Sequence, residues 1–93
     1  MRLDYYLKVT RLVPRRSGAG DLCREGMVEV NGLPGKAGRP VHPGDRIKVR
    51  FLSRELVVEV LGLPEKKTVS KVAARTFYTV LEEKRFDLWG REQ

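Results

Sequence analysis

The sequence predicts an α+β domain in which an N-terminal helix-turn-helix packs on a small antiparallel sheet, followed by a short C-terminal extension. Apolar residues recur at helical spacing near the start of the chain, and from about residue 28 they alternate with polar residues. Glycine and proline mark the turns between these segments. A chain of 93 residues, of which 41% are hydrophobic, is long enough for one domain with a modest core.

The first helix is expected over residues 3–12, where apolar residues recur every three or four positions. Asp4 stands near its start, where a carboxylate accepts hydrogen bonds from backbone N–H groups or offsets the helix dipole. Pro14 disfavours the helical conformation at Val13, so the helix should end there. The stripe expected to face the core comprises Leu3, Tyr6, Leu7 and Thr10.

A second helix is expected to begin with Pro14 in its first turn and to end at Gly26. Apolar residues recur three and four positions apart on one face of this helix, at Ala19, Leu22 and Cys23. Gly18 and Gly20 each weaken a helix by about 1 kcal/mol relative to alanine, so tertiary packing must stabilise this one.

Strands are expected where the periodicity changes. The stretch "MVEVNG" alternates and ends in Asn31-Gly32, a tight-turn signal. An irregular loop over residues 33–45 leads to the alternating stretch "RIKVRF", and a turn over residues 52–55 leads to "LVVEVLGL", which makes a hairpin. Pro64 ends this last strand.

The segment after Pro64 gives mixed signals. Val69, Val72 and Ala73 have the spacing of a short helix, whereas residues 77–81 are compatible with a helix or a strand. The last residues are expected to be frayed. Trp89, near the end, is either a docking anchor or a packing residue.

Charge indicates the class of partner. The net charge is +7, and residues 1–50 hold eleven basic and five acidic groups. Such a bias indicates a polyanionic partner, with nucleic acid first and an anionic membrane surface second. A single cysteine, no signal peptide and no apolar run of membrane-spanning length predict a cytoplasmic protein with no membrane partner.

The helix-turn-helix carries the charges best suited to phosphate. Lys8 and Arg11 are expected on one helical face, and Arg15 and Arg16 in the first turn of the second helix. The helix dipole disfavours cations at that end unless an anion binds there, so the arrangement favours a sugar-phosphate backbone. The alternative is that these side chains are solvated surface groups. The second helix offers no set of base-reading residues, which favours recognition of RNA by shape and backbone.

No catalytic residue, metal site or cofactor is expected. His42 lies in a turn beside proline, and Cys23 lies on an apolar stripe, so neither is placed as a nucleophile or base. The stretch "GLPGKAG" lacks the spacing of a phosphate-binding loop and is expected to be a surface loop. The protein is therefore predicted not to be an enzyme. Among the aromatic residues, Tyr5 lies off the apolar stripe and is the best candidate to stack on a base.

An ordered set of motifs resembles a known family. "RLD" at the start, paired arginines after the turn, "EGMVEVNG", Lys36 and the pattern of "VHPGDRIKV" follow one another from Arg2 to about Val49. This set resembles the RNA-binding domain first described in the fourth small-subunit ribosomal protein, the S-four domain. The chain length, the basic hairpin and the ending "YTVLEEKR" are similar to the small RqcP (YabO) family of bacterial ribosome-associated quality control.

The resemblance implies a function. Such proteins bind ribosomal RNA and tRNA on large ribosomal subunits obstructed by peptidyl-tRNA, and they assist an RqcH-type elongation factor that adds alanine tails. It implies that the chain is a monomer off the ribosome. The first candidates for RNA contact are Arg2, Arg15 and Arg16, and the second are Lys8, Arg11, Lys36 and Arg39.

The sequence leaves open how the C-terminal residues are placed and which binding function the chain has. Residues 1–63 are expected to form the S-four domain, and residues 64–93 an extension that belongs to the same compact unit or docks on a partner. The alternatives to the quality-control function are a general S-four-type accessory or heat-shock protein that binds ribosomal RNA or tRNA, and a protein-interaction module that uses a sheet edge or Trp89.

Overall fold

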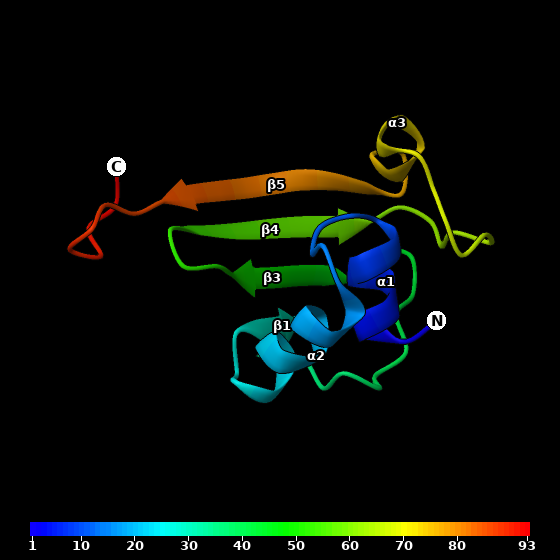
Figure 1. Ribbon diagram of the computed structural model, residues 1–93, viewed down its shortest axis with the longest axis horizontal. Helices are drawn as coiled ribbons and strands as arrows, with labels where there is room; N and C mark the ends of the chain where they lie inside the picture. The colour runs from blue at the N-terminus through cyan, green and yellow to red at the C-terminus, as the bar shows by residue number, and fades with distance from the viewer.

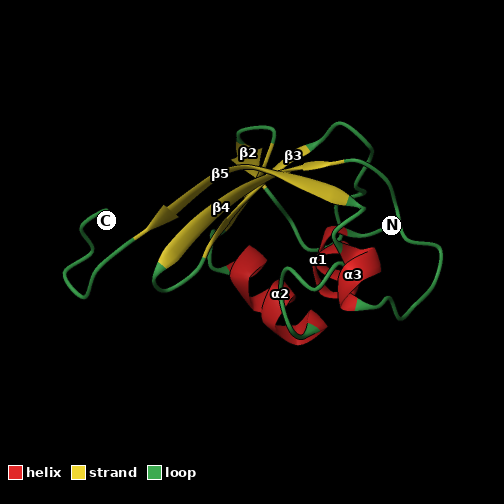
Figure 2. Cartoon of the chain, turned by 90° about the horizontal axis from the view of Figure 1, so that it is seen from above, coloured by secondary structure: helices red, strands yellow, loops and turns green.

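A computed structural model describes all residues 1–93, and it shows a five-stranded antiparallel sheet with three helices on one face (Figures 1 and 2). The strand order is β2-β1-β3-β4-β5. This architecture confirms the predicted α+β class. The elements are α1 (Leu3–Val9), α2 (Arg16–Arg24), β1 (Val28–Val30), β2 (Leu33–Pro34), β3 (Arg46–Arg50), β4 (Arg54–Val60), α3 (Lys71–Ala74) and β5 (Tyr78–Arg85).

Helix α1 buries the predicted stripe but is shorter than expected. Leu3, Tyr6 and Leu7 are fully buried. The helix ends at Val9 because Arg11 adopts the left-handed conformation, with φ of 62°. Leu12 and Val13 are buried in the turn that follows, so the apolar pattern continues beyond the helix and made it look longer.

Helix α2 begins two residues later than expected. Arg15 is extended, with φ of −131° and ψ of 145°, and Arg16 is the first helical residue, so Pro14 lies in the turn and not in the helix. Ala19 is fully buried, and the other two residues of the predicted stripe are half-buried against the core. Gly26, with φ of 76°, follows the end of the helix as predicted.

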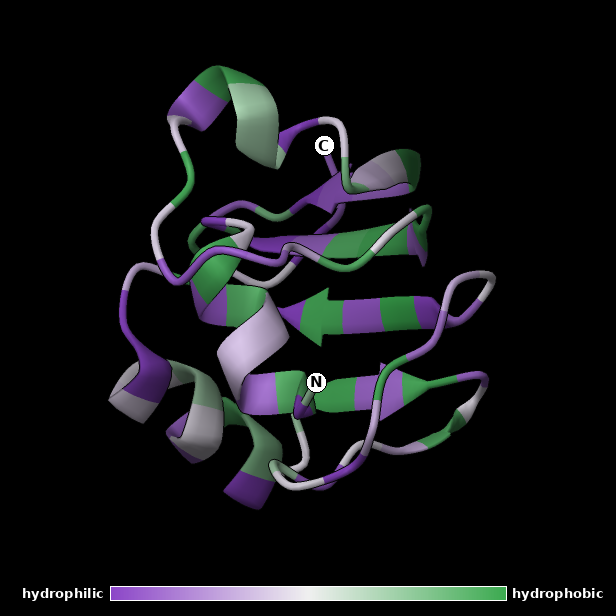
Figure 3. Ribbon diagram, turned by 90° about the vertical axis from the view of Figure 1, so that its right-hand side faces the viewer, coloured by the Kyte–Doolittle hydropathy of each residue, from purple (hydrophilic) through white to green (hydrophobic).

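The sheet follows the predicted alternation, with two changes. Asn31 and Gly32 form the tight turn with φ of 53° and 81°, and residues Leu33–Pro34, expected in a loop, pair with β1 as the short strand β2. The turn after β3 is shorter than expected, because β4 already begins at Arg54, where Arg54 pairs with β5 and Glu55 pairs with β3. Figure 3 shows the resulting alternation of apolar and polar residues along the strands. The side of the sheet under the helices contributes to the core Val28, Val30, Ile47, Val49, Leu56, Val58 and Val60.

The C-terminal segment adds a short helix and an edge strand. Helix α3 forms where a helix was expected, but Val69 precedes it and Val72 is 79% exposed, because Ala74 is the residue that faces the core. The ambiguous residues after Phe77 form β5, which pairs with β4 from Val60–Tyr78 to Arg54–Arg85. The last residues extend past the end of the sheet (Figure 1), and Trp89 is 80% exposed.

Two long-range hydrogen bonds connect α1 and the turn after it with the segment after β4. The buried Tyr6 hydroxyl donates to the carbonyl of Phe77 at 2.7 Å, and burial raises the pKa of Tyr6. Arg11 Nε donates to the carbonyl of Val69 at 2.8 Å. The turn after α1 is therefore held beside residues 63–77. No helix has the length and apolar character needed to cross a membrane.

Candidate nucleic-acid interface

The start of α1 is held by the loop between β2 and β3. The backbone N–H of Leu3 donates to the carbonyl of Arg39 at 2.8 Å, and that of Asp4 donates to the carbonyl of Ala37 at 3.1 Å. Gly35 allows this close approach, because a β-carbon there would lie 2.9 Å from Cδ2 of Leu3. Two of the free N–H groups of the helix are thus satisfied by backbone, and the Asp4 carboxylate accepts from a third, that of Tyr5, at 2.8 Å.

The carboxylate of Asp4 joins two of the predicted RNA-binding arginines. Arg2 donates from Nε at 3.2 Å and from Nη2 at 3.3 Å, and Arg16 donates from Nε at 3.4 Å. The Asp4 residue is only 6% exposed, whereas the side chains of Arg2 and Arg16 are 55% and 50% exposed. One buried acceptor therefore orients two guanidinium groups that remain open to solvent. We call these three residues the Arg2–Asp4–Arg16 cluster.

The electrostatics of the cluster keep the carboxylate charged. Burial acts to raise the pKa of Asp4, but hydrogen bonds from Arg2 and from the backbone of Tyr5, together with the charge of Arg16, outweigh it. The pKa of Asp4 therefore lies below its usual value. Two arginines share one carboxylate, so the cluster keeps a net positive charge.

The neighbouring groups add to this positive surface. The guanidinium of Arg16 lies 5.4 Å from the ring centre of Tyr5, which supports its orientation by a cation–π contact. Arg15 is exposed at the start of α2, and no side chain caps that helix end. The backbone N–H groups of the first turn therefore add to the positive potential around Arg15 and Arg16.

The loop that holds α1 carries two further predicted residues. Lys36 is exposed, and Gly38 in the same loop lies against Arg2, since a β-carbon there would be 3.7 Å from Nη2. Arg39 is half-buried, and its charge acts on Asp45. Lys36 thus extends the surface around Arg2, while Arg39 lies toward the turn before β3.

Lys8 and Arg11 lie at the other end of α1. The expectation that they share a helical face is wrong, because Arg11 lies after the helix. Both nevertheless line one small pocket, together with Lys67. Helix α1 is about 10 Å long at 1.5 Å per residue, so this second group of cations stands apart from the Arg2–Asp4–Arg16 cluster.

Sequence reasoning missed the cations that the C-terminal segment adds here. Lys67 lines the pocket of Lys8 and Arg11, and Lys71 and Arg75 line a second pocket that Arg11 also borders. The stretch "PEKKTVSKVAAR" holds four basic residues and one acidic residue, and this local charge bias is the signal that could have identified them.

The remaining candidates have ordinary surroundings. His42 is exposed, with Nδ1 3.9 Å from the Asp45 carboxylate. Cys23 is half-buried, and burial raises the pKa of its thiol. The site therefore presents a set of solvent-facing cations, and such a set is suited to binding phosphate groups.

Comparison with known proteins identifies the family. Residues 1–47 match the S4 domain family, which covers nearly all of the span that carried the resemblance in the sequence. The RQC P-site tRNA stabilizing factor of Halalkalibacterium halodurans is 43% identical over 89% of this chain and 92% of its own length. The factor of the same name from Bacillus subtilis is 41% identical over 91% of this chain and 96% of its own length.

A solved structure supports the fold as well. The trimeric structure of Vibrio cholerae Heat Shock Protein 15 matches with a TM-score of 0.78 and 25% identity, over 86% of this chain and 80% of that protein. The identity to the stabilizing factors extends over nearly the whole chain and includes the C-terminal segment beyond residue 47. The chain therefore belongs to the S4 domain family of RNA-binding proteins and, within it, to the family of RQC P-site tRNA stabilizing factors.

Proposed function

We propose that this protein is an RNA-binding factor of ribosome-associated quality control. It binds ribosomal RNA and tRNA on large ribosomal subunits obstructed by peptidyl-tRNA, and it assists an RqcH-type elongation factor in adding alanine tails. The family relationship supports this function, since the relatives are named for stabilising a tRNA in the P site. The protein acts in the cytoplasm, as a monomer when off the ribosome, and its contribution is binding and not catalysis.

The Arg2–Asp4–Arg16 cluster is the observation that carries the proposal. Asp4 engages Arg16 through Nε, and neither Nη atom of Arg16 has a hydrogen-bond partner within the protein. A guanidinium held in this way presents a planar fork that matches two oxygens of a phosphate. The cluster therefore recognises the RNA backbone, and the positions of its arginines select the shape of the RNA.

The other predicted residues extend this contact. Arg15 adds positive charge at the start of α2. Lys36 and Arg39 extend the contact with RNA along the loop that holds α1. Residues 1–63 supply this surface, and we assign residues 64–93 to the same compact unit. The pairing of β5 with β4 and the hydrogen bond from Tyr6 to Phe77 support that assignment.

Gradient sedimentation of the tagged protein from lysate tests the proposal, with each fraction blotted for peptidyl-tRNA and the RqcH-type factor. The wild type should migrate with large subunits that carry peptidyl-tRNA, and Arg16→Ala should shift toward the top of the gradient. Arg24→Ala is the matched control, because Arg24 lies on the same helix, is 68% exposed and pairs with Asp21. Unchanged migration of a folded Arg16→Ala variant would contradict the role of the cluster.

A second candidate function follows from the likeness to Heat Shock Protein 15. In this case the chain is a general accessory or heat-shock factor that binds ribosomal RNA or tRNA. Purified large subunits with and without bound peptidyl-tRNA separate the two functions. The quality-control function predicts binding that depends on peptidyl-tRNA, whereas equal binding to both kinds of subunit would favour the accessory function.

A further inference from the structure

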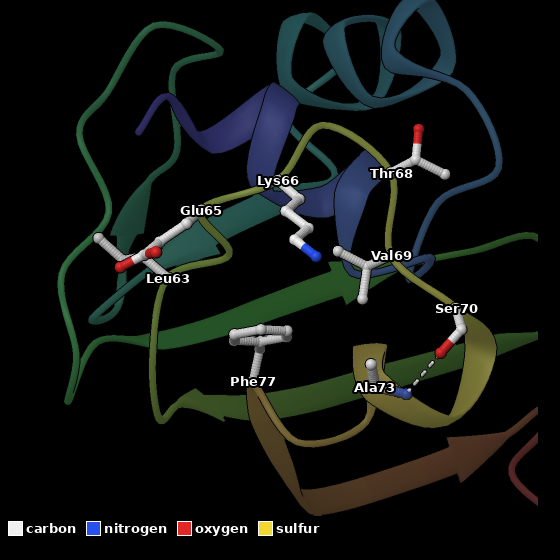
Figure 4. A pocket seen from close by; sticks show the side chains of 8 residues that line it. All are labelled: Leu63, Glu65, Lys66, Thr68, Val69, Ser70, Ala73 and Phe77. Carbon is white, nitrogen blue, oxygen red and sulfur yellow. Dashed lines mark hydrogen bonds between the residues drawn. The ribbon is translucent and has the colours of Figure 1, made fainter.

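A continuous groove runs between the turn after α1 and residues 63–77. Its widest part is a pocket of about 490 Å³ over Phe77, shown in Figure 4. Thr68 and Val69 line both this pocket and the small one beside Lys8. Arg11 borders that small pocket and the next one along, of about 420 Å³, and its hydrogen bond to Val69 holds the two sides of the groove together.

The charge of this groove is almost entirely positive. Its lining includes one acidic residue, Glu65, and six basic residues, none of which forms an ion pair within the protein. The basic residues are Lys8, Arg11, Lys66, Lys67, Lys71 and Arg75. In contrast, Lys84, Arg85 and Arg91 farther along the chain each pair with a carboxylate. Unpaired like charges repel one another, so a bound polyanion would relieve the repulsion.

The wide end of the groove also offers an aromatic side chain, Phe77, whose backbone is anchored. Phe77 is half-buried, and its backbone carbonyl accepts hydrogen bonds from the Tyr6 hydroxyl and from the N–H of Leu61. Figure 4 shows Lys66 extending its amine toward the space between Phe77 and Val69. A half-buried aromatic side chain on an anchored backbone, beside free cations, is a combination suited to binding an unstacked nucleobase and its phosphates.

We propose that this groove, made by the six basic residues and Phe77, is a second RNA-binding site. It takes a single-stranded RNA segment, such as a loop, whose phosphates lie along the cations while one unstacked base packs on Phe77. The inference rests on the proposed function and deepens it. The groove lies at the opposite end of α1 from the Arg2–Asp4–Arg16 cluster, so one chain would hold two RNA segments at once.

Binding to two RNA probes tests this site, one a stem with an unpaired loop and the other a blunt duplex of the same stem. The first variant is Lys67→Ala/Lys71→Ala, chosen because Lys67 and Lys71 are both exposed. Its matched control is Lys84→Ala/Arg91→Ala, which removes the same charge from ion-paired positions. The groove variant should flatten the slope of log K against log salt by about 0.7 per lost phosphate contact, and the control should not.

Phe77→Leu tests the base contact separately, because leucine keeps an apolar side chain but provides no stacking surface. We expect its affinity for the loop RNA to fall about five-fold or more, with little change for the duplex. Circular dichroism establishes that each variant is folded. Equal loss for both RNAs would overturn the stacking assignment.

Arg16→Ala, measured in parallel, separates this inference from the proposed function. If Arg16→Ala weakens binding while Lys67→Ala/Lys71→Ala matches its control, the second site is wrong and the proposed function stands. If neither variant weakens binding, both are wrong. A groove variant that keeps its RNA affinity but loses binding to poly-glutamate would assign the groove to an acidic protein partner and would also overturn the inference.

Discussion

At the scale of single residues, Asp4 is the most informative position in the chain. Ion pairs with half-exposed arginines contribute little to stability, because water screens them. The geometry gives Asp4 a different role, since it is buried and accepts from Nε of both Arg2 and Arg16. Asp4 therefore positions the arginines for an external anion.

Asp4→Asn tests this positioning role. The substitution raises the net charge from +7 to +8, so attraction to RNA at long range should increase. The two arginines lose their charged acceptor, and we expect RNA affinity to fall about three- to ten-fold, which corresponds to roughly 1 kcal/mol of lost positioning. Fluorescence anisotropy with a labelled ribosomal RNA helix measures the change.

The matched control is Asp21→Asn, which makes the same change in charge on an exposed carboxylate that pairs with Arg24. We expect its affinity for RNA to be unchanged or slightly higher. If Asp4→Asn bound as tightly as this control, net charge alone would account for RNA binding.

The same carboxylate predicts a dependence of stability on pH. The folded-state pKa of Asp4 lies below its usual value of 3.8, so its interactions stabilise the folded chain above that pH. This stabilisation is lost as the pH falls below about 4 and through the folded-state pKa. Urea unfolding between pH 2 and pH 6 should show a steeper acid loss for the wild type than for Asp4→Asn. Parallel curves would contradict the lowered pKa.

At the scale of elements, two glycines have opposite roles. Gly35 is where the loop after β2 approaches α1, and a β-carbon there would lie 2.9 Å from Cδ2 of Leu3 and 3.2 Å from the carbonyl of Val28. Gly35→Ala should therefore lower the free energy of unfolding by about 1–3 kcal/mol through overpacking. It should also weaken RNA binding, because the loop carries Lys36. Thermal unfolding and anisotropy measure the two effects.

Gly18→Ala is the contrasting control. A β-carbon at Gly18 would lie 3.7 Å from Cγ1 of Val13, which is an ordinary contact. Alanine favours the helix over glycine by about 1 kcal/mol, so this variant should be more stable than the wild type. Destabilisation of both variants would mean that α2 needs its glycines for a reason other than space.

Helices and strands were predicted correctly from the sequence where neighbouring residues determine them, and incorrectly where tertiary contacts do. Residues 28–30 and their turn were predicted correctly because alternation and Asn31-Gly32 are local signals. The end of α1 was not, because Leu12 and Val13 are buried in a turn and extend the helical pattern. Residues 77–81 were compatible with a helix or a strand, since most residues of β5 are exposed and only pairing with β4 fixes their conformation.

The candidate site shows the same limit. Arginines close in sequence to the helix-turn-helix could be predicted, and the structure brings Arg2 and Arg16 together on Asp4. The contribution of Lys67 could not be predicted, because the hydrogen bond that places its segment beside α1 joins Arg11 to Val69, 58 residues away. Charge bias indicates that such a segment is basic, but only the tertiary fold shows which surface it joins.

At the scale of the whole molecule, the extension is tied to the N-terminal helix through the core. The Tyr6 hydroxyl donates to Phe77, and Tyr6 is fully buried beside Leu7. Strand β5 continues the sheet from β4, whose inward residues belong to the same buried cluster as α1. These connections favour a single cooperative unit, in which both candidate RNA sites depend on one core.

Leu7→Ala tests this cooperativity. Leu7 is fully buried in that core, and its truncation should lower the free energy of unfolding by about 2–4 kcal/mol. If the chain is one unit, the amide NMR signals of β3 and β5 should disappear at the same urea concentration, and Leu7→Ala should shift both midpoints equally. A variant in which β3 unfolds early while β5 and Phe77 keep the wild-type midpoint would show that residues 64–93 fold separately. In that case the groove would lose Lys8 and Arg11 together with α1, and only the part formed by residues 64–93 would keep its fold.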